Sequence, residues 1–352
     1  MDAGPIWAAQ EFPLPAEPVA KSSLYRHQVT KAAVAAVLTA VERFEHGDWE
    51  PEALDYDCPD VRGTLRPTMR QADRAIDWSR DPAPHIIRTI RAADSRPGVL
   101  DATLFETELY LFGAHEEDRL HGASGEILAQ REGAICVATV DGALWISHAS
   151  ATDGLHASIK LPAAQVLRSR LEAVPEYPLA PTAPCDHRTF RDIVYSERNG
   201  VGYLAFDFYN GAMSTRQCRR LRKAFRRARA ADTRVIVLKG GRDYFSNGIH
   251  LNVIEASPDP AAESWANINA IDDLVLDILE TRSQLVVSAM GGNAGAGGAM
   301  MALAADRVIV SDSVVLNPHY KGMGGLFGSE YWTYTLPRRV GARTADELTN
   351  GR

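Results

Sequence analysis

The sequence lacks the features of a nucleic-acid binder, a membrane protein or a secreted protein. It has 38 Lys and Arg against 45 Asp and Glu, a formal net charge of −7, whereas proteins that hold phosphate backbones carry an excess of basic side chains. The densest apolar stretch, residues 32–41, is far shorter than the ~20 residues of a membrane-spanning helix. No basic segment followed by an apolar one opens the chain, so we expect a cytoplasmic protein that binds neither nucleic acid nor membrane.

Cysteine is also scarce. Cys58, Cys136, Cys185 and Cys218 show no Cys-x-x-Cys spacing, which predicts reduced thiols rather than disulfides or a zinc site. The chain has no glycine-rich dinucleotide-binding turn after its first strand, no Walker loop and no Gly-x-Ser-x-Gly turn. These absences argue against the common nucleotide-binding and serine-hydrolase sites. We expect no bound metal.

Proline-rich segments divide the chain. Four prolines prevent a helix in residues 1–20. A helix is predicted from about residue 22 to residue 46, with Ser22 or Ser23 capping its start and Gly47 ending it. Residues 66–92 resemble a second helical region. Residues 172–190 contain four more prolines and no periodicity, which is typical of a stiff linker.

The residues before this linker have the alternating pattern of strands, with a hairpin pair at Asp141-Gly142. The predicted strands lie at 103–112, 134–140 and 143–146. This pattern predicts a small β-barrel or sandwich of about 50 residues.

The residues after the linker alternate between strand and helix. Strands are predicted at 201–208, 234–239, 285–290 and 307–311, and helices at 215–230, 262–282 and 298–305. This order predicts a mostly parallel sheet covered by helices, so the fold class is α/β.

The predicted helix at 215–230 is strongly basic. Its charged side chains are Arg216, Arg219, Arg220, Arg222, Lys223, Arg226, Arg227 and Arg229. One interpretation is a solvated helix face. The other is a site for a ligand with several phosphates, because arginine can bind each phosphate with two hydrogen bonds.

Two glycine-bearing turns offer main-chain N–H groups. The first covers residues 244–251 and the second covers residues 292–300, where it opens a helix rich in Ala and Met. N–H groups at such turns can stabilise negative charge that develops on a thioester oxygen. Each turn taken alone is more often a tight packing corner.

The order and spacing of these turns resemble the crotonase (enoyl-CoA hydratase/isomerase) superfamily, through a Phe-x-x-Gly-x-x-Leu turn at 245–251 and a glycine-rich turn and helix at 295–306. The resemblance implies that the N–H groups of Ile249 and Gly297 form an oxyanion hole for a coenzyme A thioester. It assigns the phosphates of coenzyme A to basic residues of the helix, Arg216, Arg219, Arg220 and Lys223. The two glutamates that a hydratase uses fall on Met300 and His319, so ordinary hydration is not expected.

Residues 316–334, together with 208–214 and 246–252, are similar to the HypX (HoxX) family of hydrogenase maturation proteins. The similarity extends over residues 193–352. It implies that Tyr320 and Glu330 take part in the decarbonylation of formyl-CoA, because a phenol and a carboxylate can pass a proton between them. Without the family pattern, these two residues would be interpreted as the edge of an aromatic-rich core and a solvated glutamate.

The first half is similar to the C-terminal, barrel-like domain of methionyl-tRNA formyltransferases, at 75–78, 86–92, 96–98 and 138–146. Asp2 would correspond to the catalytic aspartate of that family, whose Asn and His would lie before residue 1. The expected organisation is a formyltransferase tail at 1–50, a formyltransferase C-terminal-like domain with a β-barrel at 62–150, a linker at 151–190 and a crotonase-like ββα spiral domain, incomplete at its C-terminal end, at 191–352.

The resemblance implies an enzyme that makes carbon monoxide for [NiFe]-hydrogenase. A formyl group would pass from 10-formyltetrahydrofolate to coenzyme A, and formyl-CoA would then lose carbon monoxide in the crotonase-like domain. The expected partners are a CoA thioester and the hydrogenase maturation machinery, and the formyl-transfer step is expected to be absent from this chain. Two alternatives stay open: an acyl-CoA hydratase or isomerase, and a non-catalytic module that binds coenzyme A or docks a partner.

Overall fold

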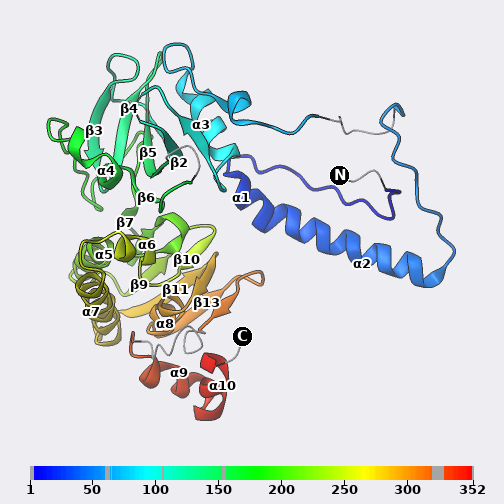
Figure 1. Cartoon of the computed structure of the whole chain (residues 1–352). Coiled ribbons are helices and arrows are strands. Elements are labelled where there is room, and N and C mark those ends of the chain that lie inside the picture. The colour runs from blue at the N-terminus through cyan, green and yellow to red at the C-terminus, as the bar shows by residue number, and fades with distance from the viewer. Residues whose placement is uncertain are drawn as a thin grey trace.

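A computed structural model describes residues 4–59, 64, 66–104, 107–152, 156–318 and 329–350. A long helical arm, a β-rich domain and an α/β domain follow one another along the chain (Figure 1). Asp2, His319 and Tyr320, which the family resemblance singled out, lie outside the described residues. Among the described residues no helix has the length and apolarity needed to cross a bilayer.

The arm is one continuous helical stretch, as predicted. It consists of α1 (Lys21–Leu24), a π-helical segment (Tyr25–Val29) and α2 (Thr30–His46), and it ends at Gly47 with φ 69°, a left-handed conformation that favours glycine. The predicted serine cap is wrong. Ala20 is the capping residue, and the Ser22 N–H instead donates to Asp94 at 3.1 Å, so the serine ties the arm to the β-rich domain.

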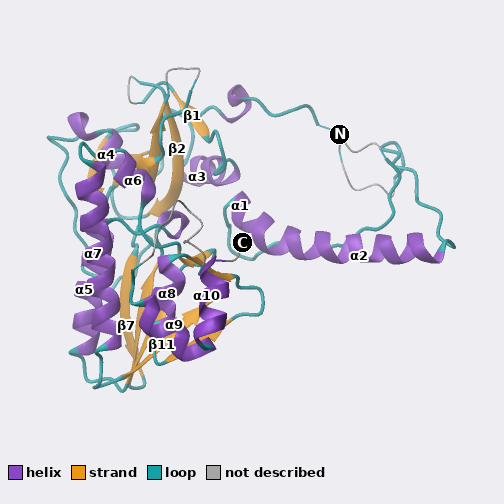
Figure 2. Cartoon of the chain, turned by 60° about the horizontal axis from the view of Figure 1, so that its bottom comes forward, coloured by secondary structure: helices purple, strands orange, loops and turns teal. Residues whose placement is uncertain are grey.

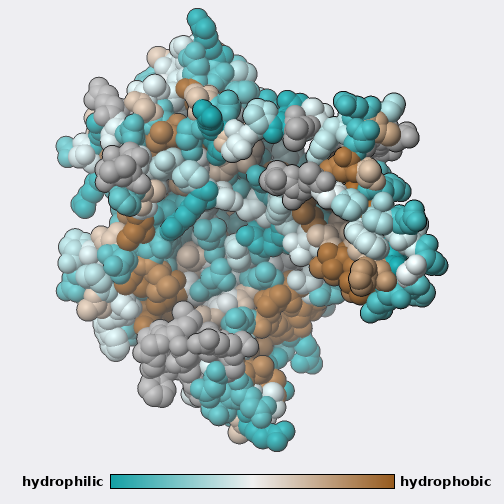
Figure 3. Space-filling model, turned by 45° about the vertical axis from the view of Figure 1, so that its right-hand side comes forward, coloured by the Kyte–Doolittle hydropathy of each residue, from teal (hydrophilic) through white to brown (hydrophobic). Residues whose placement is uncertain are grey.

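Apart from Ala32, the apolar side chains of α2 are not buried. Its exposed members are Val34, Val37, Leu38, Val41 and Phe44. Apolar surface accordingly gathers on the projecting arm (Figure 3).

The second predicted helical region is shorter than expected. Only a 3₁₀ turn (Gln71–Arg74) and α3 (Ala83–Ala92) are helical within 66–92. Pro82 precedes α3, and a carboxylate oxygen of Asp141 accepts the Ala83 N–H at 2.8 Å. A proline is disfavoured in a helix interior, so Pro82 separates α3 from the rest of the region that the sequence pattern had joined.

The β-rich domain is an antiparallel sheet. Its strands are β1 (Val99–Asp101), β2 (Leu109–Glu117), β3 (Ile127–Arg131), β4 (Ala134–Ala138), β5 (Ala143–Ala151) and β6 (Leu161–Pro162). The order is β1-β2-β5-β4-β3, with β6 on β5. Within the described part of the chain no pairing joins β1 to β3, so the sheet is six-stranded and a closed barrel is not confirmed.

Two local predictions for this sheet have different outcomes. The hairpin at Asp141-Gly142 is confirmed, because it joins the antiparallel strands β4 and β5. The first predicted strand, 103–112, is wrong at residues 103, 104, 107 and 108, since β2 begins only at Leu109. There the carboxylate of Asp101 accepts the N–H groups of Thr103 and Leu104, a side-chain turn that ends β1. Strand β3 was missed.

Residues of the expected linker take part in this domain. After β6 come α4 (Ala163–Val166) and a 3₁₀ turn (Arg168–Arg170), and Leu167 and Leu171 lie in the core formed by α3 and the sheet. Further on, the main-chain N–H of Gln130 in β3 donates to the carbonyl of Pro175, and the main-chain carbonyl of Gln130 accepts from the N–H of Tyr177, both at 2.8 Å. The proline-rich segment is therefore held along the sheet edge.

The α/β domain confirms the predicted parallel sheet. Its strands are β7 (Ile193–Arg198), β8 (Val201–Phe206), β9 (Val235–Lys239), β11 (Leu285–Met290) and β13 (Arg307–Val310), in the order β13-β11-β9-β8-β7. Only β7 runs antiparallel to its neighbour. A second, three-stranded parallel sheet was missed, and it consists of β10 (Tyr244–Ser246), β12 (Asn293–Gly295) and β14 (Leu316–Asn317).

Helices cover this domain. They are a 3₁₀ turn (Tyr209–Gly211), α5 (Thr215–Arg229), α6 (Leu251–Glu255), α7 (Pro260–Leu279), α8 (Gly297–Leu303), α9 (Trp332–Val340) and α10 (Ala342–Asn350). Helices α5 and α7 lie side by side (Figure 2). Their buried faces and the main sheet form the largest apolar core of the domain.

Candidate functional site

The two glycine-bearing turns meet at one edge of the three-stranded sheet. Strands β10 and β12 are parallel neighbours, so the turns that follow them leave the sheet on the same side. A Cβ added to Gly248 would lie 3.2 Å from the main-chain nitrogen of Gly297, and one added to Gly298 would lie 2.1 Å from the carbonyl oxygen of Ser246. The chain therefore needs glycine here, and Ile249 and Gly297 belong to turns that touch.

Glu330 is the acidic group at this edge. Its side chain is 5% exposed, so the interpretation of a solvated glutamate is wrong. A Cβ added to Gly297 would come within 2.1 Å of its Oε1, which places the carboxyl directly against the second turn. The Ser329 N–H donates to Oε2 at 3.2 Å.

Burial raises the pKa of Glu330 to about 7, and the negative charge of Asp272 acts in the same direction. No cationic group among the described residues offsets this effect, and burial of an unpaired carboxyl stabilises its neutral form. With a pKa near 7, both protonation states are populated at neutral pH, which suits a group that accepts a proton in one step and returns it in another.

The positions at which hydratases carry glutamates do not supply acids here. Met300 is fully buried and packs with Leu336 and Ala345 of α9 and α10. His319 lies outside the described residues, as does Tyr320. Among the described residues, Glu330 is thus the carboxyl that the fold places against Gly297.

The basic helix α5 borders a cleft of about 950 Å³ between the β-rich domain and the α/β domain, and Arg216, Arg219, Arg220 and Lys223 all line it. Two of the four have partners. Arg220 binds Asp192 with two hydrogen bonds of 2.7 and 2.8 Å, and Arg216 contacts Glu132 at 3.0 Å.

Other arginines of α5 face α7, where Arg222 and Arg226 both contact Asp277. Within the described part of the chain no ion pair holds Arg219 or Lys223. Much of the charge of α5 is therefore paired within the protein, and of the four predicted phosphate-binding residues Arg219 and Lys223 are the two without a described ion pair. The phosphate site itself stays a prediction.

A cluster of rings and one lysine joins the two domains beside the cleft. The ammonium group of Lys160 lies 3.0 Å from the Tyr209 hydroxyl and 3.5 Å from the ring centre of Phe112, and Tyr209 stacks on His148 at 4.2 Å. Burial lowers the pKa of Lys160 to about 8. These contacts fix the β-rich domain against the α/β domain.

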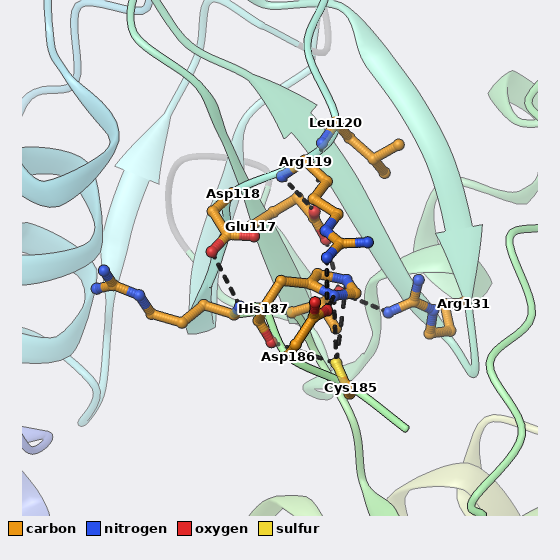
Figure 4. A network of polar contacts seen from close by, with 10 residues as sticks. Glu117, Asp118, Arg119, Leu120, Arg131, Cys185, Asp186 and His187 are labelled. Atoms are coloured by element: carbon orange, nitrogen blue, oxygen red, sulfur yellow. Dashed lines mark hydrogen bonds and ion pairs between the residues drawn. The ribbon is translucent and has the colours of Figure 1, made fainter. Parts of the chain in front are cut away.

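A second polar cluster has the composition of a metal site but another role. Ligand atoms of Glu117, Asp118 and His187 lie close together, with Cys185 near His187 (Figure 4). Four hydrogen bonds reach the two oxygens of Glu117, from the indole N–H of Trp145, the hydroxyl of Thr189 and the main-chain N–H groups of Arg119 and Leu120. These donors use the lone pairs that a metal would need, so the cluster fastens the linker to the sheet.

Sequence reasoning missed Asp272. It lies in the middle of α7, and its Oδ1 accepts the Glu330 N–H at 2.6 Å. Nothing in the local pattern of an amphipathic helix distinguishes such an aspartate from a solvated one, because its partner is 58 residues away.

The comparisons with known proteins match both halves of the chain. A family model described as enoyl-CoA hydratase/isomerase matches residues 197–351, and one described as formyl transferase, C-terminal domain, matches residues 68–165. A methionyl-tRNA formyltransferase of Roseiflexus castenholzii is 32% identical over 146 residues, 41% of this chain and 44% of the relative.

Two relatives match the whole chain. The hydrogenase maturation factor HoxX of Bradyrhizobium diazoefficiens is 50% identical over 351 residues, 100% of this chain and 59% of the relative. The crystal structure of HypX from Aquifex aeolicus in complex with tetrahydrofolic acid has a TM-score of 0.93 and 45% identity, covering 100% of this chain and 60% of that one. The chain is thus a homologue of the hydrogenase maturation factors HoxX and HypX, and it spans about three fifths of their length.

Proposed function

We propose that this chain belongs to a HypX-type maturation protein and carries the step that releases carbon monoxide from formyl-CoA. The observation that carries the proposal is the buried carboxyl of Glu330, which lies against Gly297 where two glycine turns meet. The homology to HoxX supports the role in hydrogenase maturation, and the tetrahydrofolic acid bound by the Aquifex HypX supports a folate as the source of the formyl group.

The proposed reaction converts formyl-CoA into carbon monoxide and free coenzyme A. The bond from the formyl carbon to hydrogen and the bond from that carbon to sulfur both break, and a sulfur–hydrogen bond forms. No oxidant or reductant is needed, because the electron pair of the C–H bond stays on carbon and the pair of the C–S bond leaves with sulfur.

The chain's own groups would divide this work. The N–H groups of Ile249 and Gly297 would hold the thioester oxygen. Glu330 and Tyr320 would move the proton from the formyl carbon to the sulfur. The pKa of Glu330, raised to about 7 by burial, suits both halves of that transfer.

Coenzyme A would place its phosphates in the cleft beside α5. Arg219 and Lys223 line this cleft without a described ion pair, so their charges are available, whereas Arg216 and Arg220 would have to share theirs with Glu132 and Asp192. Formyl transfer from 10-formyltetrahydrofolate to coenzyme A would precede this step. Asp2 would correspond to the catalytic aspartate of that transfer, which this chain by itself is not expected to carry out. The product would pass to the machinery that matures [NiFe]-hydrogenase.

The test is to supply formyl-CoA and follow carbon monoxide through the absorbance of reduced myoglobin. We expect release by the unmodified protein and a loss of about 10²–10⁴-fold in Glu330→Gln and Tyr320→Phe, the range of general acid–base catalysis, with the fold retained. If both variants release carbon monoxide at the rate of the unmodified protein, the assignment of Glu330 and Tyr320 is contradicted. Hydration of crotonyl-CoA would favour a hydratase, and binding of coenzyme A without turnover would favour a docking module.

A further inference from the structure

The main chain around Glu330 has an unusual conformation. Glu330 and Tyr331 have φ values of 49° and 56°, so two consecutive non-glycine residues are left-handed immediately before α9. Such residues are energetically unfavourable and persist only where surrounding contacts fix them.

The contact that fixes this turn comes from α7. Oδ1 of Asp272 accepts the Glu330 N–H at 2.6 Å. Next to Asp272 on the helix, Ile271, Leu274 and Val275 are buried in the core of the domain. The acceptor therefore belongs to a rigid element, which is what holds a reacting side chain in place.

We infer that Asp272 is a positioning residue for Glu330: its carboxylate fixes the left-handed turn and so directs the Glu330 carboxyl against Gly297. This role deepens the proposed function and rests on it, because Asp272 acts on the reaction only through Glu330. The contact itself stands independently of the reaction.

Asp272 also acts through its charge. A carboxylate beside Glu330 disfavours a second negative charge and so keeps Glu330 protonated to a higher pH. Among the described residues, three other titratable groups face this pair: the phenol of Tyr331, whose pKa is raised by burial and by the charge of Asp272, the thiol of Cys218, and the carboxyl of Asp273. The thiol of Cys218 on α5 is neutral, with a pKa raised by burial to about 12, and Asp273 is half exposed and paired with Arg222.

The charge and the hydrogen bond can be separated. In Asp272→Asn the amide oxygen can still accept the Glu330 N–H, but the negative charge is gone. In Asp272→Ser the charge is also removed, and the side chain that carries the acceptor oxygen is shorter. This variant serves as a second test if the asparagine variant does not fold. Asp273→Asn is the matched control, since it removes the same charge from the next residue of the same helix.

The experiment is a carbon-13 NMR titration of the full chain labelled at the glutamate carboxyl carbons. The Glu330 signal is identified by its absence from Glu330→Gln. We expect a midpoint near pH 7 in the unmodified protein. We expect a decrease of about one pH unit or more in Asp272→Asn and in Asp272→Ser, and a decrease of less than a third of that in Asp273→Asn.

The outcomes separate this inference from the proposed function. The role of Asp272 is overturned if the Glu330 midpoint is unchanged in both Asp272 variants, or if Asp273→Asn shifts it equally. This holds whether or not carbon monoxide is made. A shifted midpoint in a protein that makes no carbon monoxide keeps the contact and removes the reaction. When both hold, the pH dependence of carbon monoxide release moves to lower pH in Asp272→Asn, a change that loss of packing alone does not produce.

Discussion

The carboxyl of Glu330 occupies the space that a side chain at position 297 would need. A Cβ on Gly297 would come within 2.1 Å of Oε1 and 2.5 Å of Cδ of Glu330. The glycine thus has two roles: it presents a main-chain N–H, and it leaves room for an acid beside that N–H.

The first prediction concerns this close approach. In Gly297→Ala the methyl group pushes the Glu330 carboxyl away and shifts the N–H, so we expect carbon monoxide release to fall by about 100-fold or more. Gly291→Ala is the control, because nothing lies within 4 Å of a Cβ built there. Similar rates in the two variants, measured with formyl-CoA, would show that the contact at Gly297 has no part in the reaction.

The second prediction concerns pH and stability. The pKa of Glu330 is raised from 4.5 to about 7, so the folded state favours the neutral acid. This contribution is complete below pH 4.5 and is lost as pH rises through about 7. The free energy of unfolding should therefore fall over this window by up to about 3 kcal/mol from this group.

Urea denaturation of the unmodified protein and of Glu330→Gln at several pH values measures this contribution. Because other groups titrate in the same window, the difference between the two proteins is the quantity to compare. It should favour Glu330→Gln increasingly from pH 5 to pH 7.5. A difference that is constant with pH would mean that Glu330 titrates normally.

The third prediction separates the roles of the arginines on α5. Arg219 and Lys223 line the cleft without a described ion pair, whereas Arg222 faces Asp273 and Asp277 of α7. We expect Arg219→Ala and Lys223→Ala each to weaken coenzyme A binding about tenfold, the loss of one charge-assisted hydrogen bond.

Arg222→Ala is the control for position on the helix. It should leave coenzyme A affinity unchanged and lower the melting temperature instead, because the buried Asp277 loses a partner. Calorimetric titration with coenzyme A and thermal denaturation measure the two effects. Weaker binding in Arg222→Ala alone would place the phosphates on the other side of the helix.

The fourth prediction concerns the cluster around Glu117. Glu117→Ala removes the acceptor of four hydrogen bonds and leaves the buried indole N–H of Trp145 without one. We expect a loss of about 2–3 kcal/mol in the free energy of unfolding. Asp118→Ala, at the exposed neighbour, should cost less than about 1 kcal/mol. Equal costs, measured by urea denaturation, would contradict the assigned role.

Much of the α/β fold could be predicted from local pattern. The strands at 201–206, 235–239 and 285–290 and the helices α5, α7 and α8 are signalled by apolar periodicity and by the glycines between them. The boundaries failed where a side chain interrupted a predicted element, as the turn at Asp101 does at the start of the predicted strand 103–112 and Pro82 does within the predicted helical region 66–92. Short strands such as β10 and β12 carry too few residues to show any period.

By itself the sequence determined the fold class, the order of the elements, and the family resemblance of its two glycine turns, because these properties depend on residues that are near one another along the chain. Only the tertiary structure decided that Glu330 is buried against Gly297, that Asp272 holds its main chain, and which arginines of α5 are paired within the protein. Each of these contacts joins residues from different elements, and the strand pairing and helix packing that bring such residues together are set by the core as a whole rather than by any local signal.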